Sequence, residues 1–205
     1  WGRATPDPEH YAEMLRATYQ GVKSVRPQWP VLGGALANVG ATNSTESGDM
    51  RMSTRVYLRR MLEAGASQWM DAVSYHPYIG PYPSNPDPRV QSNTLFAAMS
   101  SSDESIRAGY ENSGTPMTDR VVATEFGAST TQGYTPEQQS YWIRMQYALW
   151  NADHPNLPLA AKTDAAFVHR AVEDPDPHYG NTYQEGFGWV KPKDAEGRFA
   201  TKPVF

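Results

Sequence analysis

Helix-like and strand-like segments alternate four times along this chain, and the alternation restricts the folds that it can form. Short apolar segments typical of buried strands lie at residues 31–37, 69–75, 121–125 and 160–169. Longer segments with helical spacing of apolar residues occupy about residues 8–25, 53–64, 94–110 and the stretch from 135 onward. Strict alternation of this kind predicts the α/β class, with a parallel sheet buried between helices.

The helix ends carry specific sequence signals. Asp7 followed by Pro8 predicts the start of the first helix, because Asp caps free amides and Pro lacks the amide that would go unpaired there. Thr135 and Gln138 have the spacing of a capping box at the start of the last helix. Gly65 predicts the end of the second helix.

The apolar positions of three helices predict which faces they bury. The expected core positions are Tyr11, Leu15, Tyr19, Val22 and Val25 in the first helix, Val56, Tyr57, Met61 and Leu62 in the second, and Tyr141, Met145, Ala148 and Leu149 in the fourth. Gly33 and Gly34 inside an apolar run predict close packing or a bulge. The proline-rich residues 77–88 predict a loop without regular structure.

The segment Ala123-Thr124-Glu125-Phe126-Gly127 places one carboxylate at the end of a predicted strand. In (β/α) barrels the chemistry lies at the carboxyl ends of the strands, where a loop begins. Glu125 is therefore a candidate nucleophile or general base. The alternative is a structural carboxylate that pairs with an arginine or caps the next helix.

Other polar and aromatic residues follow the neighbouring predicted strands. His76 and Tyr78 follow the second strand, and His169, Arg170 and Asp174 follow the fourth. Because the carboxyl ends of parallel strands meet at one edge of a sheet, we expect these side chains near Glu125. A tyrosine hydroxyl and a histidine can orient a carboxylate and keep it ionised.

Composition excludes several classes of function. The 205 residues carry a net charge of −4 and no cysteine, which argues against a nucleic-acid-binding face, disulfides and thiolate metal sites. We expect no cofactor, since there is no glycine-rich phosphate loop, and no metal, since the five histidines lack metal-ligand spacing. No apolar segment reaches the roughly 20 residues of a membrane span. The 12 Tyr, 6 Trp and 6 Phe residues suit either an aromatic-lined sugar cleft or an ordinary core.

Four segments in order resemble the retaining glycoside hydrolases built on a (β/α)₈ barrel, the clan that contains the β-xylosidase-like and cellulase-like families. They are Gly33-Gly34-Ala35-Leu36-Ala37, Asp71-Ala72-Val73-Ser74-Tyr75-His76-Pro77-Tyr78, Thr124-Glu125-Phe126-Gly127, and Phe187-Gly188 followed by Lys202-Pro203. The resemblance covers nearly the whole chain. It implies a (β/α)₈ TIM-barrel fold, of which this chain holds about strands five to eight, so that residues 1–205 form a single partial barrel domain.

The resemblance also assigns roles to individual residues. Glu125 matches the nucleophile of the clan, and His76 and Tyr78 match positions that line the subsite where the sugar is cleaved. The final strand of the clan presents an aromatic residue, often Trp, to the sugar, whereas this chain has Phe167 and His169 in that region. Trp189 is a candidate substitute or a core residue.

The general acid/base of the clan comes from an Asn-Glu-Pro strand end that corresponds to sequence before Trp1. We therefore expect that residue upstream, and we expect the missing half of the barrel from the same parent chain or from another chain. Retaining hydrolysis needs a nucleophile and a general acid/base, and the carboxyl groups of these two residues lie about 5–5.5 Å apart.

Two hypotheses about function remain open at this point. The first is hydrolysis of glycosidic bonds in a polysaccharide or glycoside by the retaining mechanism, with a carbohydrate as partner. The second is a non-catalytic carbohydrate-binding or assembly domain derived from a glycosidase barrel. Of the possible locations, an extracellular or cell-surface one is favoured.

Overall fold

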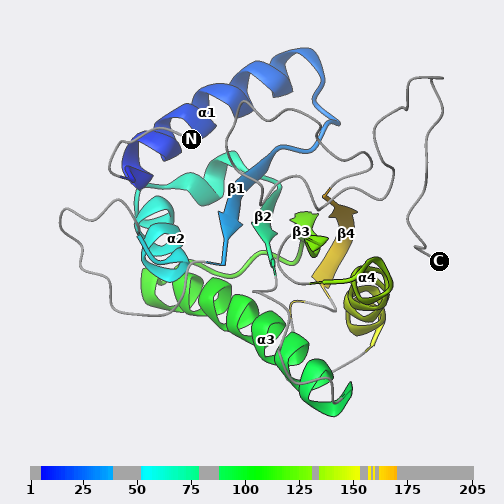
Figure 1. Cartoon of the computed structure of the whole chain (residues 1–205). Coiled ribbons are helices and arrows are strands. Elements are labelled where there is room, and N and C mark those ends of the chain that lie inside the picture. The colour runs from blue at the N-terminus through cyan, green and yellow to red at the C-terminus, as the bar shows by residue number, and fades with distance from the viewer. Residues whose placement is uncertain are drawn as a thin grey trace, which may run out of the picture. The chain divides into compact units, whose positions relative to one another are not determined.

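In the computed structural model, the described residues are 6–38, 52–78, 88–130, 134–152, 157, 159 and 162–169, and for residues 88–94 only the backbone is described. Helices and strands alternate along them, as Figure 1 shows by colour from the N-terminus onward. The order is α1 (Pro8–Val25), β1 (Leu32–Ala37), α2 (Thr54–Glu63), the 3₁₀ helix η1 (Ala66–Trp69), β2 (Ala72–His76), α3 (Pro88–Ser113), β3 (Val121–Phe126), α4 (Pro136–Asn151) and β4 (Thr163–Val168).

The four strands form one sheet in the order β1-β2-β3-β4. Strand β1 pairs with β2 in parallel, and β2 pairs with β3 in parallel, with Val73 level with Val121. The predicted α/β class with a parallel sheet is therefore confirmed.

The chain divides into two compact units. Unit 1 contains Trp1–Pro77, Ser100–Thr124 and Lys162–Ala165, and unit 2 contains Tyr78–Met99, Glu125–Ala161 and Ala166–Phe205. The division passes through α3, β3 and β4, so these three elements contribute to both units.

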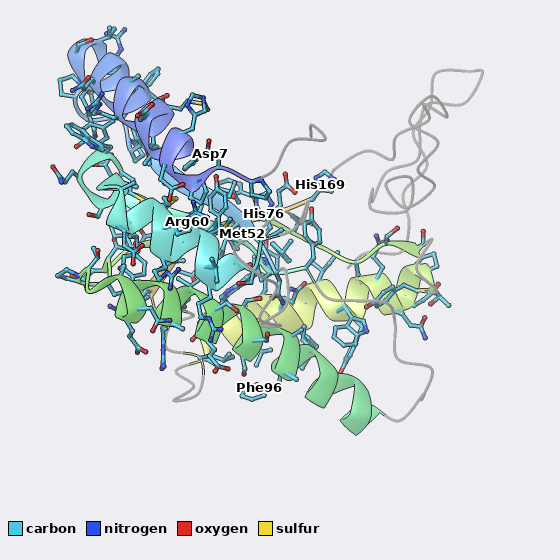
Figure 2. The ribbon with its side chains drawn as sticks, turned by 90° about the vertical axis from the view of Figure 1, so that its left-hand side faces the viewer. Asp7, Met52, Arg60, His76, Phe96 and His169 are labelled. Atoms are coloured by element: carbon cyan, nitrogen blue, oxygen red, sulfur yellow. The ribbon has the colours of Figure 1, made fainter. Side chains whose placement is uncertain are left out.

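In unit 1, α1 and α2 pack on each other and on the β1 side of the sheet. The guanidinium of Arg60 in α2 bonds both carboxylate oxygens of Glu9, at 2.8 and 2.9 Å. Figure 2 shows Arg60 and, close to it, Asp7 at the start of α1, whose carboxylate accepts from the backbone N–H of His10. The predicted Asp7 cap is thus confirmed.

A bulge interrupts the pairing of β1 with β2. Gly33 is level with Val73 and Leu36 with Tyr75, so β1 contains one extra residue between these pairs. Gly34 and Ala35 both have positive φ, at 106° and 51°, and a side chain at Gly34 would place Cβ 2.8 Å from the backbone oxygen of Ser74.

Side chains satisfy the amides that the bulge removes from the ladder. The amide of Gly34 donates to the Tyr11 hydroxyl, and that of Ala35 to the Ser74 hydroxyl, both at 2.8 Å. The Ser74 hydroxyl in turn donates to the Gly33 carbonyl at 3.2 Å. The predicted bulge at the glycine pair is confirmed, and Tyr11 and Ser74 account for how its backbone is stabilised.

The connection from α1 to β1 is fixed by a lysine and an aspartate. The Lys23 ammonium lies 2.8 Å from the Asp71 carboxylate and also donates to the carbonyl oxygens of Pro27 and Trp29. Asp71 accepts from the amide of Val31 at 2.7 Å. Burial alone would raise the pKa of Asp71, but these hydrogen bonds, with the nearby positive charges of Lys23 and Arg120, bring it below its ordinary value.

Several boundaries and faces differ from the sequence predictions. Helix α3 begins at Pro88, six positions before the expected 94, because a proline fits the first turn of a helix as well as a loop. Trp69 belongs to η1, so β2 starts later than expected. Val25 was expected in the core and is 66% exposed, since it ends α1 and the residues around it, 24–30, are all exposed.

The predicted inner face of α4 is also wrong. Ala148 is exposed, and the buried residues of α4 are Gln139, Ser140, Trp142, Ile143, Gln146 and Trp150. The buried row includes two glutamines, which a search for apolar periodicity assigns to the surface. The predicted capping box of Thr135 and Gln138 is present.

Gly109→Ala tests the packing of α3 on α2 in the full-length protein. An added Cβ would lie 2.8–3.0 Å from three side-chain atoms of the fully buried Leu58. We expect the free energy of unfolding to fall by about 1–2 kcal/mol in chemical denaturation, despite the better helix propensity of Ala. Gly21→Ala in α1 is the control, because no atom lies within 4 Å of its Cβ, and it should be neutral or slightly stabilising. Equal effects of the two changes would contradict this packing.

Asp71→Asn should lower the free energy of unfolding by about 1–2 kcal/mol at neutral pH, because a hydrogen-bonded carboxylate is lost. A lowered pKa in the folded state means that Asp71 contributes stability above its unfolded pKa of about 3.9, and that this contribution disappears as pH falls through the folded value. Denaturation curves at several pH values should therefore converge in acid for the two proteins. The control is Asp164→Asn, which removes an exposed partner of Arg120 and should cost less than about 1 kcal/mol. If the difference in unfolding free energy between Asp71→Asn and the unmodified protein stayed constant into strong acid, the stabilising role of the ionised Asp71 carboxylate would be refuted.

Candidate active site

Strand β3 carries Glu125 to its carboxyl end. Val121 and Ala123 are fully buried, which fixes the strand in the sheet, and Glu125 is the next-to-last residue, with a half-buried side chain. The chain then leaves the sheet through residues 127–129, which are buried although they form no regular element. The carboxylate therefore stands at the edge of a firmly packed strand, where the sequence predicted it.

A tyrosine holds this carboxylate. The hydroxyl of Tyr78 donates a hydrogen bond to Oε2 of Glu125 at 2.8 Å. Both residues belong to unit 2, and both side chains are partly exposed. A hydrogen bond to one carboxylate oxygen restricts the rotation of the group.

His169, labelled in Figure 2, joins this pair through its contact with Tyr78. Its ring meets the ring of Tyr78 edge to face, with centroids 6.2 Å apart and an interplanar angle of 85°. Its backbone amide donates to the carbonyl of Phe126 at 2.8 Å, which fastens the chain after β4 to the end of β3. We refer to Tyr78, Glu125 and His169 as the Glu125 cluster.

Phe167 lies two residues before His169, in β4, and is 56% exposed. His169 follows directly after the last residue of β4, Val168. The assignment of Phe167 to substrate binding stays a prediction. Trp189, Arg170 and Asp174 lie outside the described residues.

His76 belongs to unit 1, where its ring nitrogen Nε2 and the hydroxyl of Thr124 are 2.9 Å apart. The two groups share one hydrogen bond, whose direction depends on the tautomer of the ring. The structure thus pairs His76 with the residue that precedes Glu125 in β3. Its predicted part in the sugar subsite stays a prediction.

Helix α4 supports the end of β3 through contacts that the sequence reasoning missed. The ring of Phe126 lies edge to face against Trp150 and Tyr147, with centroids 4.6 and 5.1 Å away. Burial raises the pKa of Tyr147, so its hydroxyl stays protonated and donates to the carbonyl of Ala166 in β4 at 3.4 Å. The side-chain amide of Gln139 donates to the carbonyl of Ala128 at 2.7 Å.

The described part of the chain contains no group of three or more His, Asp or Glu residues placed to hold a metal ion. Within the same residues, no helix is both long and apolar enough to cross a membrane.

Comparison with solved structures shows the fold to which this arrangement belongs. A family 39 glycoside hydrolase from the gut symbiont Bacteroides cellulosilyticus is similar with a TM-score of 0.54 and 20% identity, over 93% of this chain and 36% of that chain. A monomeric β-xylosidase from Caulobacter crescentus is similar with a TM-score of 0.51 and 19% identity, over 97% and 36% of the two chains. A family 51 arabinofuranosidase from Xanthomonas axonopodis pv. citri has a TM-score of 0.56 and 13% identity, over 95% and 37%.

The expected resemblance is therefore confirmed at the level of the fold, which is that of part of a TIM-barrel glycoside hydrolase. The chain spans little more than a third of the length of these three structures. No protein-family model and no curated protein sequence matches it.

A double-mutant cycle tests the hydrogen bond that defines the Glu125 cluster. Tyr78→Phe and Glu125→Leu, alone and together in the full-length protein, should show a coupling free energy of about 0.5–1.5 kcal/mol in denaturant unfolding, because each change removes one partner. Tyr147→Phe is the matched control, since its hydroxyl bonds Ala166. Coupling of Glu125→Leu with Tyr147→Phe as large as with Tyr78→Phe would show that the bond has no specific energetic role.

Proposed function

We propose that this chain is the nucleophile-bearing part of a retaining glycoside hydrolase, with Glu125 as the nucleophile. The observation that carries the proposal is the 2.8 Å hydrogen bond from the Tyr78 hydroxyl to Oε2 of Glu125 at the end of a barrel strand. The Glu125 side chain stays partly exposed, so a ligand can reach the carboxylate. The barrel fold of the similar glycoside hydrolases gives independent support for the reaction class.

In the proposed reaction, a Glu125 oxygen attacks the anomeric carbon of the sugar while the bond to the leaving oxygen breaks. A second carboxylic acid donates its proton to that oxygen, and the aglycone departs. The same group, now ionised, takes a proton from water, whose oxygen attacks the anomeric carbon and releases Glu125. Two displacements on one carbon leave its configuration unchanged.

The second carboxylic acid is proposed to come from an Asn-Glu-Pro strand end in sequence before Trp1, in the half of the barrel that complements residues 1–205. Under this proposal residues 1–205 are one partial barrel domain. A nucleophile alone would still act on sugars with very good leaving groups, because these depart without protonation. General acid/base assistance contributes about 10²–10⁴-fold for ordinary substrates.

The remaining predicted site residues fit distinct roles in this proposal. Tyr78 orients Glu125 for attack, and His169 packs edge to face with the Tyr78 ring. Phe167 offers an exposed aromatic face to a sugar. The assignments of His76 and Trp189 to sugar binding stay predictions.

Replacement of Glu125 tests the proposal in the full-length protein with nitrophenyl glycosides, starting with β-xylosides and α-arabinofuranosides. Glu125→Gln should lower kcat by at least about 10³-fold, because the nucleophile is lost, and should leave the unfolding temperature nearly unchanged. Glu125→Ala should regain turnover in azide, since the anion attacks the anomeric carbon in one displacement and yields a glycosyl azide of inverted configuration. Glu137→Gln, an exposed change in α4, is the matched control and should be fully active.

Normal turnover by Glu125→Gln would end the proposal. An azide product of retained configuration would assign Glu125 to acid/base catalysis instead. Glycan binding without any hydrolysis by the unmodified protein, and unaffected by Glu125→Gln, would identify a non-catalytic carbohydrate-binding domain.

A further inference from the structure

The backbone on the carboxyl side of Glu125 is held by buried contacts to one helix. Residues 127–129 leave the sheet without joining another helix or strand, yet Ala128 and Ser129 are 1% and 0% exposed. Buried backbone outside regular structure needs partners for its polar groups, because each unpaired group costs about 1–3 kcal/mol. The carbonyl of Ala128 finds its partner in the side chain of Gln139.

Gln139 is well suited to fix that carbonyl. Its side chain is 1% exposed, and its amide nitrogen Nε2 donates to the Ala128 oxygen at 2.7 Å. Breaking the bond would leave the Ala128 carbonyl without this donor in a water-poor environment, so the bond constrains position more than an exposed one would.

The first turn of α4 in turn fixes Gln139. Its backbone amide donates to the carbonyl of Thr135 at 2.8 Å. The amide of Thr135 donates to the side chain of Gln138, and the Thr135 hydroxyl accepts from the amide of Gln138, at 2.7 and 3.2 Å. Thus the donor that holds Ala128 belongs to a capped and rigid helix end.

Phe126 supplies a second attachment of the same segment to α4. Its fully buried ring packs against Trp150 and Tyr147, and its carbonyl accepts from the amide of His169. The residue directly after Glu125 is therefore immobilised by side chain and backbone, and Ala128, two residues further on, is immobilised by Gln139. All these residues belong to unit 2.

We propose that Gln139 is a positioning residue for the proposed nucleophile, acting through its hydrogen bond to the Ala128 carbonyl, which fixes the direction in which the chain leaves β3 and so the placement of the Glu125 carboxylate. The inference rests on the proposed function and assigns a part in it to a residue that does not touch the sugar. Displacement of a reacting group by about 1 Å can cost about 10²-fold in rate, so a firm attachment at this point affects turnover directly.

The test compares Gln139→Met with Gln146→Met in the full-length protein. Gln146 lies seven residues further along α4 and is 0% exposed, so the two changes remove the same amide from equally buried positions of one helix. For nitrophenyl glycosides we expect Gln139→Met to lower kcat by about 10–100-fold with KM within about threefold of the unmodified protein. Gln146→Met should keep kcat within about twofold of the unmodified protein. This difference between the variants should persist even if both unfold at similar temperatures.

Hydrogen exchange distinguishes a local effect on residues 127–130 from a general loss of stability. The amides of residues 127–130 should exchange faster in Gln139→Met than in Gln146→Met, when the two are compared under conditions of equal global stability. Equal kcat values for the two variants, or equal exchange in this segment, would overturn the proposal. Absence of turnover by the unmodified protein would instead refute the proposed function.

Gln139→Glu covers the case in which the methionine variant does not fold. A protonated glutamic acid donates to the Ala128 oxygen as the amide does, whereas an ionised one repels it. The kcat of this variant, divided by that of the unmodified protein at the same pH, should therefore rise as the pH is lowered. A ratio that does not change with pH would count against the role of Gln139.

Discussion

The packing of Phe126 against α4 is the contact on which the candidate site depends. A strand end has no strand neighbours beyond it to set its direction, so the side chain of its last residue and the bonds of its backbone must do so. The Phe126 ring lies against Tyr147 and Trp150, and its carbonyl accepts from His169. These contacts place the preceding carboxylate where Tyr78 can reach it, so the geometry of the Glu125 cluster follows from hydrophobic packing one residue away.

Signals that act within a few residues predicted much of this structure. The Asp7 cap, the capping box at Thr135 and the bulge at Gly34 follow from local backbone chemistry, and the structure contains all three. The position of Glu125 at a strand end could also be predicted, because a short apolar segment typical of a buried strand ends beside it.

Features that depend on contacts between distant segments could not be predicted in this way. The buried row of α4 contains Gln139 and Gln146, whose place in the interior depends on partners such as the Ala128 carbonyl, and sequence periodicity treats such residues as surface. Pro88 was assigned to a loop, because a proline suits both a turn and the first position of a helix. The partner of His76, Thr124, lies 48 positions away in the sequence, and only the pairing of β2 with β3 brings the two residues together.

The bulge in β1 has a consequence for how this strand can change in length. Strand β1 has two residues between Gly33 and Leu36, whereas β2 has one between Val73 and Tyr75, so the bulge absorbs one residue without moving the pairs on either side. A single-residue deletion here would leave Leu36 level with Tyr75 and Ala37 level with His76, and would remove only the bulge and its positive-φ backbone. The glycine pair is therefore a point at which β1 can lose a residue while the side chains at its carboxyl end keep their partners in β2.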